Sequence, residues 1–361
     1  MRNFGLDLIR AISIWLVLLY HFGFDSAIFK PYGIGGYGVE IFFVLSGFLI
    51  GSILLRSLNN ENKLKSIIEF WVRRWFRILP LYYLMVLFKF HFIGPDIGKN
   101  IFYYIFFLQN HFFGISFYSV TWSLVIEEWF YLIAPIFLSI SISFFKLKNA
   151  NLVWPITGFI ISVILLRSLF VLGLNRDFNS IYGSVPLRLD SIFIGVLLAL
   201  IKTYYSSLYT HLSKLRVFGY AIIFIFLFIL FNGYSHLHLP IVKDIFLCLG
   251  FTILSFHIAL LFPMMEKLNV DVWNKRTPLI RKFITLTSLL TYGIYLIHPI
   301  FLYSLRDYIF IFESRTLNLL VTIILTYFAS FIVYQTFEKP ILMLRDKLTK
   351  KGTSPLKYQV D

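Results

Sequence analysis

The sequence contains almost no cysteine and few charged residues. Among its 361 residues, 14% are charged and only Cys248 is a cysteine. One cysteine inside an apolar run excludes both a disulfide framework and a cysteine metal site. The sequence also lacks internal repeats, linkers rich in proline, glycine or serine, and any soluble domain of appreciable length. We therefore expect any chemistry to occur within one continuous domain or at its faces.

The residues that are present are mostly apolar. The chain is 58% hydrophobic, whereas soluble globular proteins average about 45–50%. This excess indicates a polytopic membrane protein. The net charge of +15 raises the possibility of nucleic-acid binding. However, Lys and Arg lie mostly in short loops between apolar runs, as they do in cytoplasmic membrane loops, so we expect no nucleic-acid partner.

Ten hydrophobic runs reach about 20 residues, the length that spans a bilayer. They lie near 5–24, 36–55, 76–94, 121–145, 152–173, 186–203, 217–234, 242–262, 285–305 and 317–337. A further run at 101–113 is short and ends in polar residues. If it crossed the membrane, the later basic loops would lie outside, against the positive-inside rule. The sequence therefore predicts an all-α polytopic transmembrane helix bundle, with about ten spans plus one re-entrant or interfacial segment.

The two ends of the chain are expected in the cytoplasm. Asp7 and Arg10 interrupt the first apolar run and no small-residue cleavage site follows, so this run is a signal anchor rather than a cleavable signal peptide. Residues 1–340 are predicted to form the integral membrane domain. Residues 341–361 are predicted to form a basic cytoplasmic tail that is frayed.

Ionisable residues fall into two tiers along the predicted spans. Such residues are costly in a membrane, so they normally face a protein interior or a water-filled cavity. A continuous polar track through the bundle would explain both tiers. The inner tier contains Asp7, Arg10, Arg73, Arg74 and Arg77, and the outer tier contains His21, Glu40, Glu127, Glu128, Arg188 and Asp190. Of these, Asp7 and Arg10 are expected to help bind a cofactor at the inner side, and Glu40, Arg188 and Asp190 are expected to be polar groups on the substrate side.

The first predicted helix carries a polar stripe. Asp7, Arg10 and His21 fall within about 60° of one another around a helix. One interpretation is a functional histidine near the outer face. The other is a structural pair of Asp7 and Arg10 with a packing histidine.

Two arginines of the inner tier can act together. Arg73 and Arg77 stand one helical turn apart, so both guanidinium groups can converge on one ligand. Paired arginines suit phosphate groups because their planar forks bind bidentately. The alternative is a positive-inside anchor that binds lipid headgroups.

The acidic residues of the outer tier are ambiguous. Glu127 and Glu128 are adjacent, so at least one must turn inward and needs a partner such as Arg188, His21 or a tyrosine. Either glutamate would be a buried ion-pair member or would orient His21. Asp190 and Arg188 form a structural or a functional pair. No local spacing matches a metal motif, so no metal is expected.

The motifs together resemble the membrane-bound acyltransferase-3 family, which includes bacterial O-antigen and nodulation-factor acetylases. The resemblance implies an enzyme of the bacterial inner membrane that moves an acyl group, usually acetyl, from cytoplasmic acyl-CoA to a glycan or similar acceptor. It also implies that His21 is required for activity and that Arg73 and Arg77 are associated with the CoA donor. The matching pieces are Leu6-Asp7-Leu8-Ile9-Arg10-Ala11, His21-Phe22, Gly38 to Phe48, Arg73 to Pro80, Trp122 to Leu132, Arg188-Leu189-Asp190, Tyr292 to His298 and Glu338-Lys339-Pro340.

The residues themselves are consistent with this chemistry. The unperturbed pKa of histidine, about 6.5, suits a general base that removes a hydroxyl proton near neutral pH. A carboxylate that accepts its other N–H would fix the tautomer. A covalent acyl-histidine relay stays open. The competing interpretation is a proton-coupled transporter, which gives no reason for CoA-dependent protection of the inner arginines.

Overall fold

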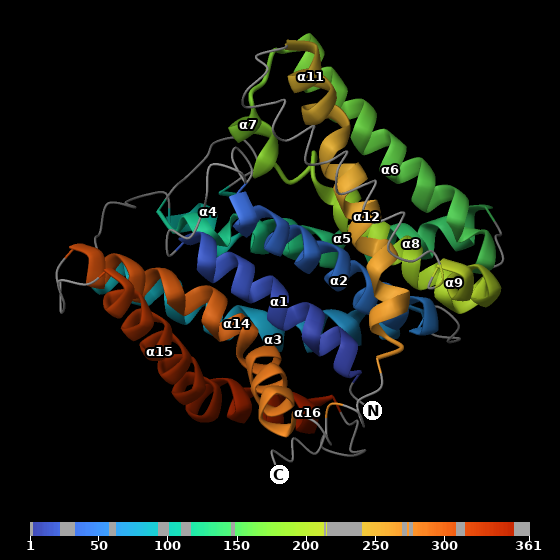
Figure 1. Ribbon diagram of the computed structural model, residues 1–361. Helices are drawn as coiled ribbons and strands as arrows, with labels where there is room; N and C mark the ends of the chain where they lie inside the picture. The colour runs from blue at the N-terminus through green and yellow to red at the C-terminus, as the bar shows by residue number, and fades with distance from the viewer. Residues whose placement is uncertain are drawn as a thin grey trace. The chain divides into compact units, whose positions relative to one another are not determined.

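Most of the residues that the computed structural model describes are helical, and these described residues contain no strand (Figure 1). Helices are the expected outcome for apolar runs in a bilayer, because a helix satisfies its own backbone N–H and C=O groups. The structure describes residues 3–21, 33–57, 63–92, 101–109, 117–145, 149–212, 214, 240–268, 273, 277–307 and 315–349.

The chain divides into two compact units, which are described separately. The first unit comprises Met1–Lys63, Phe107–Ile115 and Trp122–Leu268. Its main helices are α1 (Phe4–His21), α2 (Gly33–Ser57), α5 (Trp122–Phe145), α6 (Val153–Ser168), α7 (Phe178–Tyr182), α8 (Leu189–Tyr204), α9 (Ser206–Leu212), α11 (Pro240–Ile245) and α12 (Phe251–Met265). It also has a 3₁₀ turn, η4 (Asn149–Leu152), and π-helical turns η5 (Leu169–Gly173) and η6 (Phe246–Gly250).

Helix α2 is the centre of the first unit and packs against both α1 and α8. Its contact with α8 is a backbone approach that only glycine permits. A Cβ atom at Gly47 would lie 1.8 Å from the Ile192 carbonyl oxygen, and one at Gly195 would lie 2.2 Å from the Val44 carbonyl oxygen. Small residues at helix crossings are typical of membrane proteins, where close van der Waals packing drives association. This crossing holds Glu40 and Asp190 on neighbouring helices.

The second unit comprises Leu64–Phe106, Ser116–Thr121 and Asn269–Asp361. Its elements are most of α3 (Lys63–Phe92), α4 (Ile101–Ile105), the 3₁₀ turn η3 (Ser119–Thr121), α14 (Pro278–Asp307), α15 (Arg315–Val333), the π-helical turn η7 (Tyr334–Glu338) and α16 (Lys339–Leu348). Tyrosine hydroxyls tie these elements together. Tyr292 donates to the Ile78 carbonyl at 2.7 Å, and Tyr295 donates to the Val120 carbonyl at 2.7 Å.

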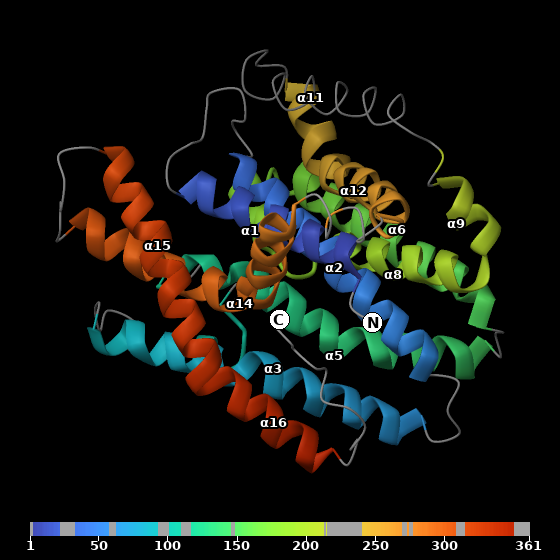
Figure 2. The same cartoon turned by 60° about the horizontal axis from the view of Figure 1, so that its bottom comes forward.

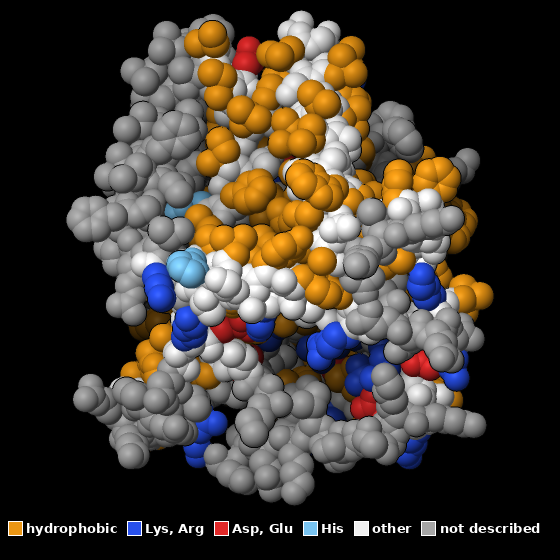
Figure 3. Space-filling view, turned by 90° about the vertical axis from the view of Figure 1, so that its right-hand side faces the viewer, with side chains coloured by type: hydrophobic (Ala, Val, Ile, Leu, Met, Phe, Trp, Pro, Cys, Tyr) orange, Lys and Arg blue, Asp and Glu red, His pale blue; other side chains and the backbone are white. Residues whose placement is uncertain are grey.

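The length and composition of the helices agree with a multi-pass membrane protein. Seven helices in the described part of the chain are long and apolar enough to span a bilayer, and the number is eight if the bent pair α8–α9 counts as one span. The 30-residue α3, which covers the predicted span 76–94 as far as Phe92, is not among them. The face in Figure 3 carries mostly hydrophobic side chains above a zone where Lys, Arg, Asp and Glu gather.

Three predicted segments have different outcomes: the run at 101–113, the span at 217–234 and the tail from 341. The run at 101–113 does not form a spanning helix, since α4 covers only Ile101–Ile105 and Phe107 has a φ of 55°. Its placement at the membrane surface stays a prediction. The span predicted at 217–234 lies outside the described residues. At the other end of the chain, α16 continues the helix to Leu348, into the segment predicted as a frayed tail.

Candidate active site

His21 is the last residue of α1, at the end of the helix opposite Asp7. Its Nδ1 atom lies 2.9 Å from the Val17 carbonyl oxygen, one turn back in the same helix. Because a carbonyl oxygen only accepts hydrogen bonds, Nδ1 must donate, and the neutral imidazole then carries its lone pair on Nε2. The Val17 carbonyl therefore takes the position at Nδ1 that the sequence analysis gave to a carboxylate. This geometry leaves Nε2 as the basic nitrogen.

At the other end of α1, the predicted pair of Asp7 and Arg10 is confirmed. Arg10 Nη1 lies 3.4 Å from Asp7 Oδ1, with the Asp7 side chain buried and Arg10 partly exposed. The Asn3 side chain donates to the backbone carbonyl of Glu266 at 3.2 Å, which ties the start of α1 to the end of α12. The stripe on α1 thus combines an ion pair at one end with a histidine at the other, and a role of Asp7 and Arg10 in binding a cofactor stays a prediction.

Glu127 and Glu128 face different surroundings, as adjacent helical residues must. Glu127 accepts hydrogen bonds from the Ser46 hydroxyl at 2.7 Å and from the Tyr131 hydroxyl at 3.2 Å. Glu128 is buried, at 4% exposure. Glu128 is therefore the glutamate that turns inward, and Glu127 joins α5 to α2 through Ser46.

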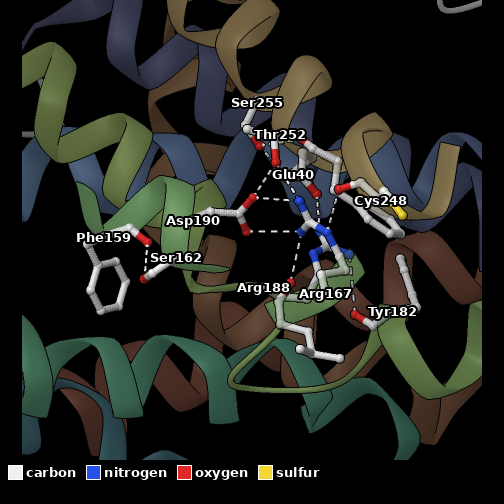
Figure 4. A network of polar contacts seen from close by, with 12 residues as sticks. Glu40, Phe159, Ser162, Arg167, Tyr182, Arg188, Asp190, Cys248, Thr252 and Ser255 are labelled. Atoms are coloured by element: carbon white, nitrogen blue, oxygen red, sulfur yellow. Dashed lines mark hydrogen bonds and ion pairs between the residues drawn. The ribbon is translucent and has the colours of Figure 1, made fainter. Parts of the chain in front are cut away.

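Glu40 and Arg188 form an ion pair in the interior of the first unit (Figure 4). Arg188 Nη2 donates to Glu40 Oε2, and the Ser255 hydroxyl donates to Glu40 Oε1. The Arg188 guanidinium also lies over the Phe251 ring, 3.8 Å from its centroid, as in a cation–π contact. Both charged side chains are fully buried, so the pair connects α2, α8 and α12 inside the bundle.

Asp190 pairs with Arg167 rather than with Arg188, and the predicted pair of Asp190 and Arg188 is wrong. The Arg167 fork contacts both Asp190 oxygens, at 3.2 and 3.0 Å, and the Thr252 hydroxyl donates to Asp190 Oδ2. Arg167 also donates to the carbonyls of Cys248 and Leu187, at 2.9 and 2.8 Å. Arg188 pairs instead with Glu40 on α2 (Figure 4).

Arg167 is a residue that the sequence analysis missed, although a signal existed. It lies six residues before the end of the predicted span 152–173, and Asp190 lies four residues into the next span, 186–203. At 1.5 Å per residue, Arg167 lies about 9 Å from the end of its span and Asp190 about 6 Å from the start of the next span. Because these two span ends lie on the same side of the bilayer, the two residues are at similar depth. A search for charges at matching depth on consecutive spans would have found the pair.

The second unit holds the arginine pair on α3. Arg77 and Glu338 line a cavity of about 10 Å³ with Phe76 and Pro80 among its walls, which has room for about one water molecule. Arg73 Nη2 donates to the Thr349 hydroxyl at 3.0 Å, just after α16 ends. Both arginines therefore face the segment from η7 to Thr349, and α16 runs beside α3 (Figure 2). The described residues include no group of three or more His, Cys, Asp or Glu that could hold a metal ion.

Comparisons with known proteins agree on the kind of protein that this chain resembles. A family model described as an acyltransferase domain, Acyl_transf_3, matches residues 3–335. The putative peptidoglycan O-acetyltransferase YrhL of Bacillus subtilis is 37% identical over 218 residues, which cover 55% of this chain and 33% of the relative. The peptidoglycan O-acetyltransferase OatA of Listeria monocytogenes is 32% identical over 217 residues, with 55% and 33% covered.

A third relative, the putative O-acetyltransferase SACOL0978 of Staphylococcus aureus, is 33% identical over 218 residues, which cover 54% of this chain and 34% of the relative. The chain thus aligns with about a third of the length of these curated relatives. No solved structure matches it significantly. The family match favours the acyltransferase interpretation over the proton-coupled transporter.

Proposed function

The chain belongs to the Acyl_transf_3 family of acyltransferase domains, and from this premise we propose that it is an O-acetyltransferase. It takes an acetyl group from acyl-CoA at the cytoplasmic side and transfers it to a hydroxyl group of a cell-envelope glycan, free or lipid-linked, at the outer side. The named activities of its relatives support the acetyl group and the glycan, since two of them carry peptidoglycan O-acetyltransferase in their names. The surrounding lipid is its other partner.

The observation that carries this proposal is the geometry of His21. With Nδ1 donating to Val17, the imidazole is held in one tautomer and Nε2 can accept a proton. In the transfer, Nε2 removes the proton of the acceptor hydroxyl while that oxygen forms a bond to the acyl carbon. The carbon–sulfur bond of the thioester breaks, and the sulfur of CoA leaves. An acyl group carried by Nε2 itself is the alternative route.

The other outer-tier residues have supporting places in this scheme. Glu128, buried on α5, is the residue that we propose stabilises the charged imidazolium, while Glu127 joins α5 to α2 through Ser46. Glu40, Arg188 and Asp190 were predicted as polar groups on the substrate side. Since all three are fully buried in ion pairs, we propose that they shape the bundle near the acceptor rather than bind it.

The function is tested by incubating the purified full chain with radiolabelled acetyl-CoA and cell-envelope glycan fractions. Label should enter the glycan, and mild alkaline treatment should release it as acetate, because O-acetyl esters are labile to base. If the glycan stays unlabelled while the protein is folded and binds CoA, the acyltransferase proposal fails.

The donor site is tested on α3. Replacing Arg73 or Arg77 with alanine should weaken acyl-CoA binding about tenfold or more, because a hydrogen bond to a charged group contributes about 1.5–3 kcal/mol. Arg→Lys should restore only part of the affinity, since the bidentate fork is lost. Calorimetric titration with CoA measures this. Arg74→Ala is the matched control, because Arg74 lies about 100° from Arg73 and about 60° from Arg77 around the helix. Unchanged CoA affinity in the Arg73→Ala/Arg77→Ala double variant would show that these two arginines do not bind the donor.

The orientation follows from the basic loops and has its own test. We propose that the chain lies in a bacterial inner membrane with both termini in the cytoplasm. Cysteines introduced at Asn110 and Lys275, in a chain with Cys248→Ser, should react with an impermeant reagent in intact cells only at position 110. Both positions lie outside the described residues, so the labelling adds information that the structure does not give. External labelling at position 275 would overturn the ten-span topology.

A further inference from the structure

Thr349 holds the Arg73 guanidinium through a hydroxyl group whose orientation is fixed. The Thr349 hydroxyl donates to the Arg345 carbonyl at 3.0 Å, within its own helix. Its only hydrogen is thereby used, so its oxygen accepts the hydrogen bond from Arg73 Nη2 at 3.0 Å. The two residues are 276 positions apart in the sequence, and this contact joins α3 to the end of α16.

Arg73 is otherwise incompletely satisfied. A guanidinium group has five N–H donors, yet the buried Nε of Arg73 has no hydrogen-bond partner among the described residues. The described residues also place no carboxylate in an ion pair with it, in contrast to Arg167 and Arg188. Because a hydroxyl group carries no charge, Arg73 keeps its full positive charge. This combination is expected of an arginine that binds an anion.

Arg77 has a different environment on the same helix face. It shares its small cavity with the carboxyl group of Glu338. Glu338 ends the π-helical turn η7, in which the Lys339 N–H donates to the Tyr334 carbonyl five residues back. Pro340 lacks an N–H group and cannot continue the α-helical pattern, so the turn widens at this position. The cavity and the Thr349 contact show that α16 and α3 run in opposite directions, with Glu338 beside Arg77 and Thr349 beside Arg73.

We propose that Thr349 is a positioning residue for the acyl donor and that α16 forms a second wall of the donor site. The hydroxyl group anchors one N–H of Arg73, so that the remaining donors are held ready for a phosphate group of CoA. The helix has no buried residue, so this wall lies at the periphery of the unit, where a large donor can enter. The inference rests on the donor site proposed above.

The test is calorimetric titration of the purified full chain with CoA, together with steady-state kinetics. Thr349→Val removes the hydroxyl group at nearly constant volume and should weaken CoA binding about five- to tenfold, the range expected when one hydrogen bond near a charge is lost. KM for the donor should rise by the same factor while kcat stays the same. Thr349→Ser keeps the hydroxyl group and should restore most of the affinity. Thr336→Val is the matched control, since Thr336 is exposed and donates only to its own helix, at the Ile332 carbonyl.

A double variant distinguishes positioning from general stability. In a chain that already carries Arg73→Ala, Thr349→Val should cause no further loss, because residues that act through one contact are not additive. If Arg73→Ala loses affinity but Thr349→Val binds CoA like the wild type, this inference is wrong and the donor site stands. If Arg73→Ala also binds normally, the donor site itself is wrong. If Thr336→Val weakens binding as much as Thr349→Val, the effect is structural and the inference is overturned.

Discussion

Replacing His21 with alanine should lower the rate of acyl transfer by about 10²–10⁴-fold, the usual contribution of a general base. The Val17 contact fixes Nδ1 as the donor and Nε2 as the base, so the alanine variant lacks the nitrogen that takes the proton. The helix should still form, since the lost hydrogen bond lies within one turn at its end. Transfer per folded molecule and CoA affinity are the two quantities to measure.

His211 offers a matched control for this experiment. Its Nδ1 lies 2.7 Å from the Ser207 carbonyl oxygen, the same contact one turn back in a helix, but on the exposed surface of α9. His211→Ala should leave transfer unchanged. A packing role for His21 predicts instead less folded protein with near-normal activity per molecule. Transfer within a few-fold of the wild type in purified His21→Ala protein would refute the general base.

Removing one member of a buried ion pair should have the largest effect on stability. Arg167→Met leaves the Asp190 carboxylate buried without its cation, and such a change typically costs about 3–5 kcal/mol. The double variant Arg167→Met/Asp190→Leu should recover part of this loss, because no charge then stays buried without a partner. The recovery should be incomplete, since the carbonyls of Cys248 and Leu187 still lose the donor that Arg167 supplied. Thermal unfolding of the purified variants in one detergent measures both.

A more exposed ion pair provides the comparison for this effect on stability. Lys202 and Glu266 lie 2.6 Å apart, but the Lys202 side chain is 42% exposed. Lys202→Met should therefore cost about 1 kcal/mol or less, the usual contribution of an ion pair in contact with solvent. If Arg167→Met unfolds at the same temperature as Lys202→Met, the buried network does not stabilise the bundle.

The sequence was sufficient to predict most of the long helices, because each depends on a local run of about 20 apolar residues. The span predicted at 217–234 lies outside the described residues and stays a prediction. The sequence was also sufficient for the pair of Asp7 and Arg10, which are one turn apart on a single helix. The partners of Arg188 and Asp190 were not predictable in the same way. Glu40 and Arg188 are 148 positions apart, and their meeting depends on how far α2 and α8 rotate about their axes. The close approach at Gly47 and Gly195 sets that rotation, and it appears in no local pattern.

The neighbours of the two arginines proposed to bind the donor were also not predictable from local patterns. The spacing of Arg73 and Arg77 was readable as a shared helix face, since both lie on α3. Their neighbours Glu338 and Thr349 come from the far end of the sequence and were not assigned to the site. Thr349 lay within the segment predicted to be frayed, because its composition is polar and basic. In the structure α16 continues to Leu348, and Thr349 directly follows it and accepts a hydrogen bond from Arg73.

The central claim is that an acetyl group passes from a cytoplasmic donor to an outer acceptor through His21. The most direct measurement uses sealed vesicles that contain the purified full chain in one known orientation. Labelled acetyl-CoA is supplied only at the cytoplasmic face and the glycan acceptor only at the outer face. We predict that label appears on the glycan with the wild type and with His211→Ala, and stays at background with His21→Ala. Label that reaches the glycan only when donor and acceptor share one face, or that reaches it equally with His21→Ala, would contradict this account.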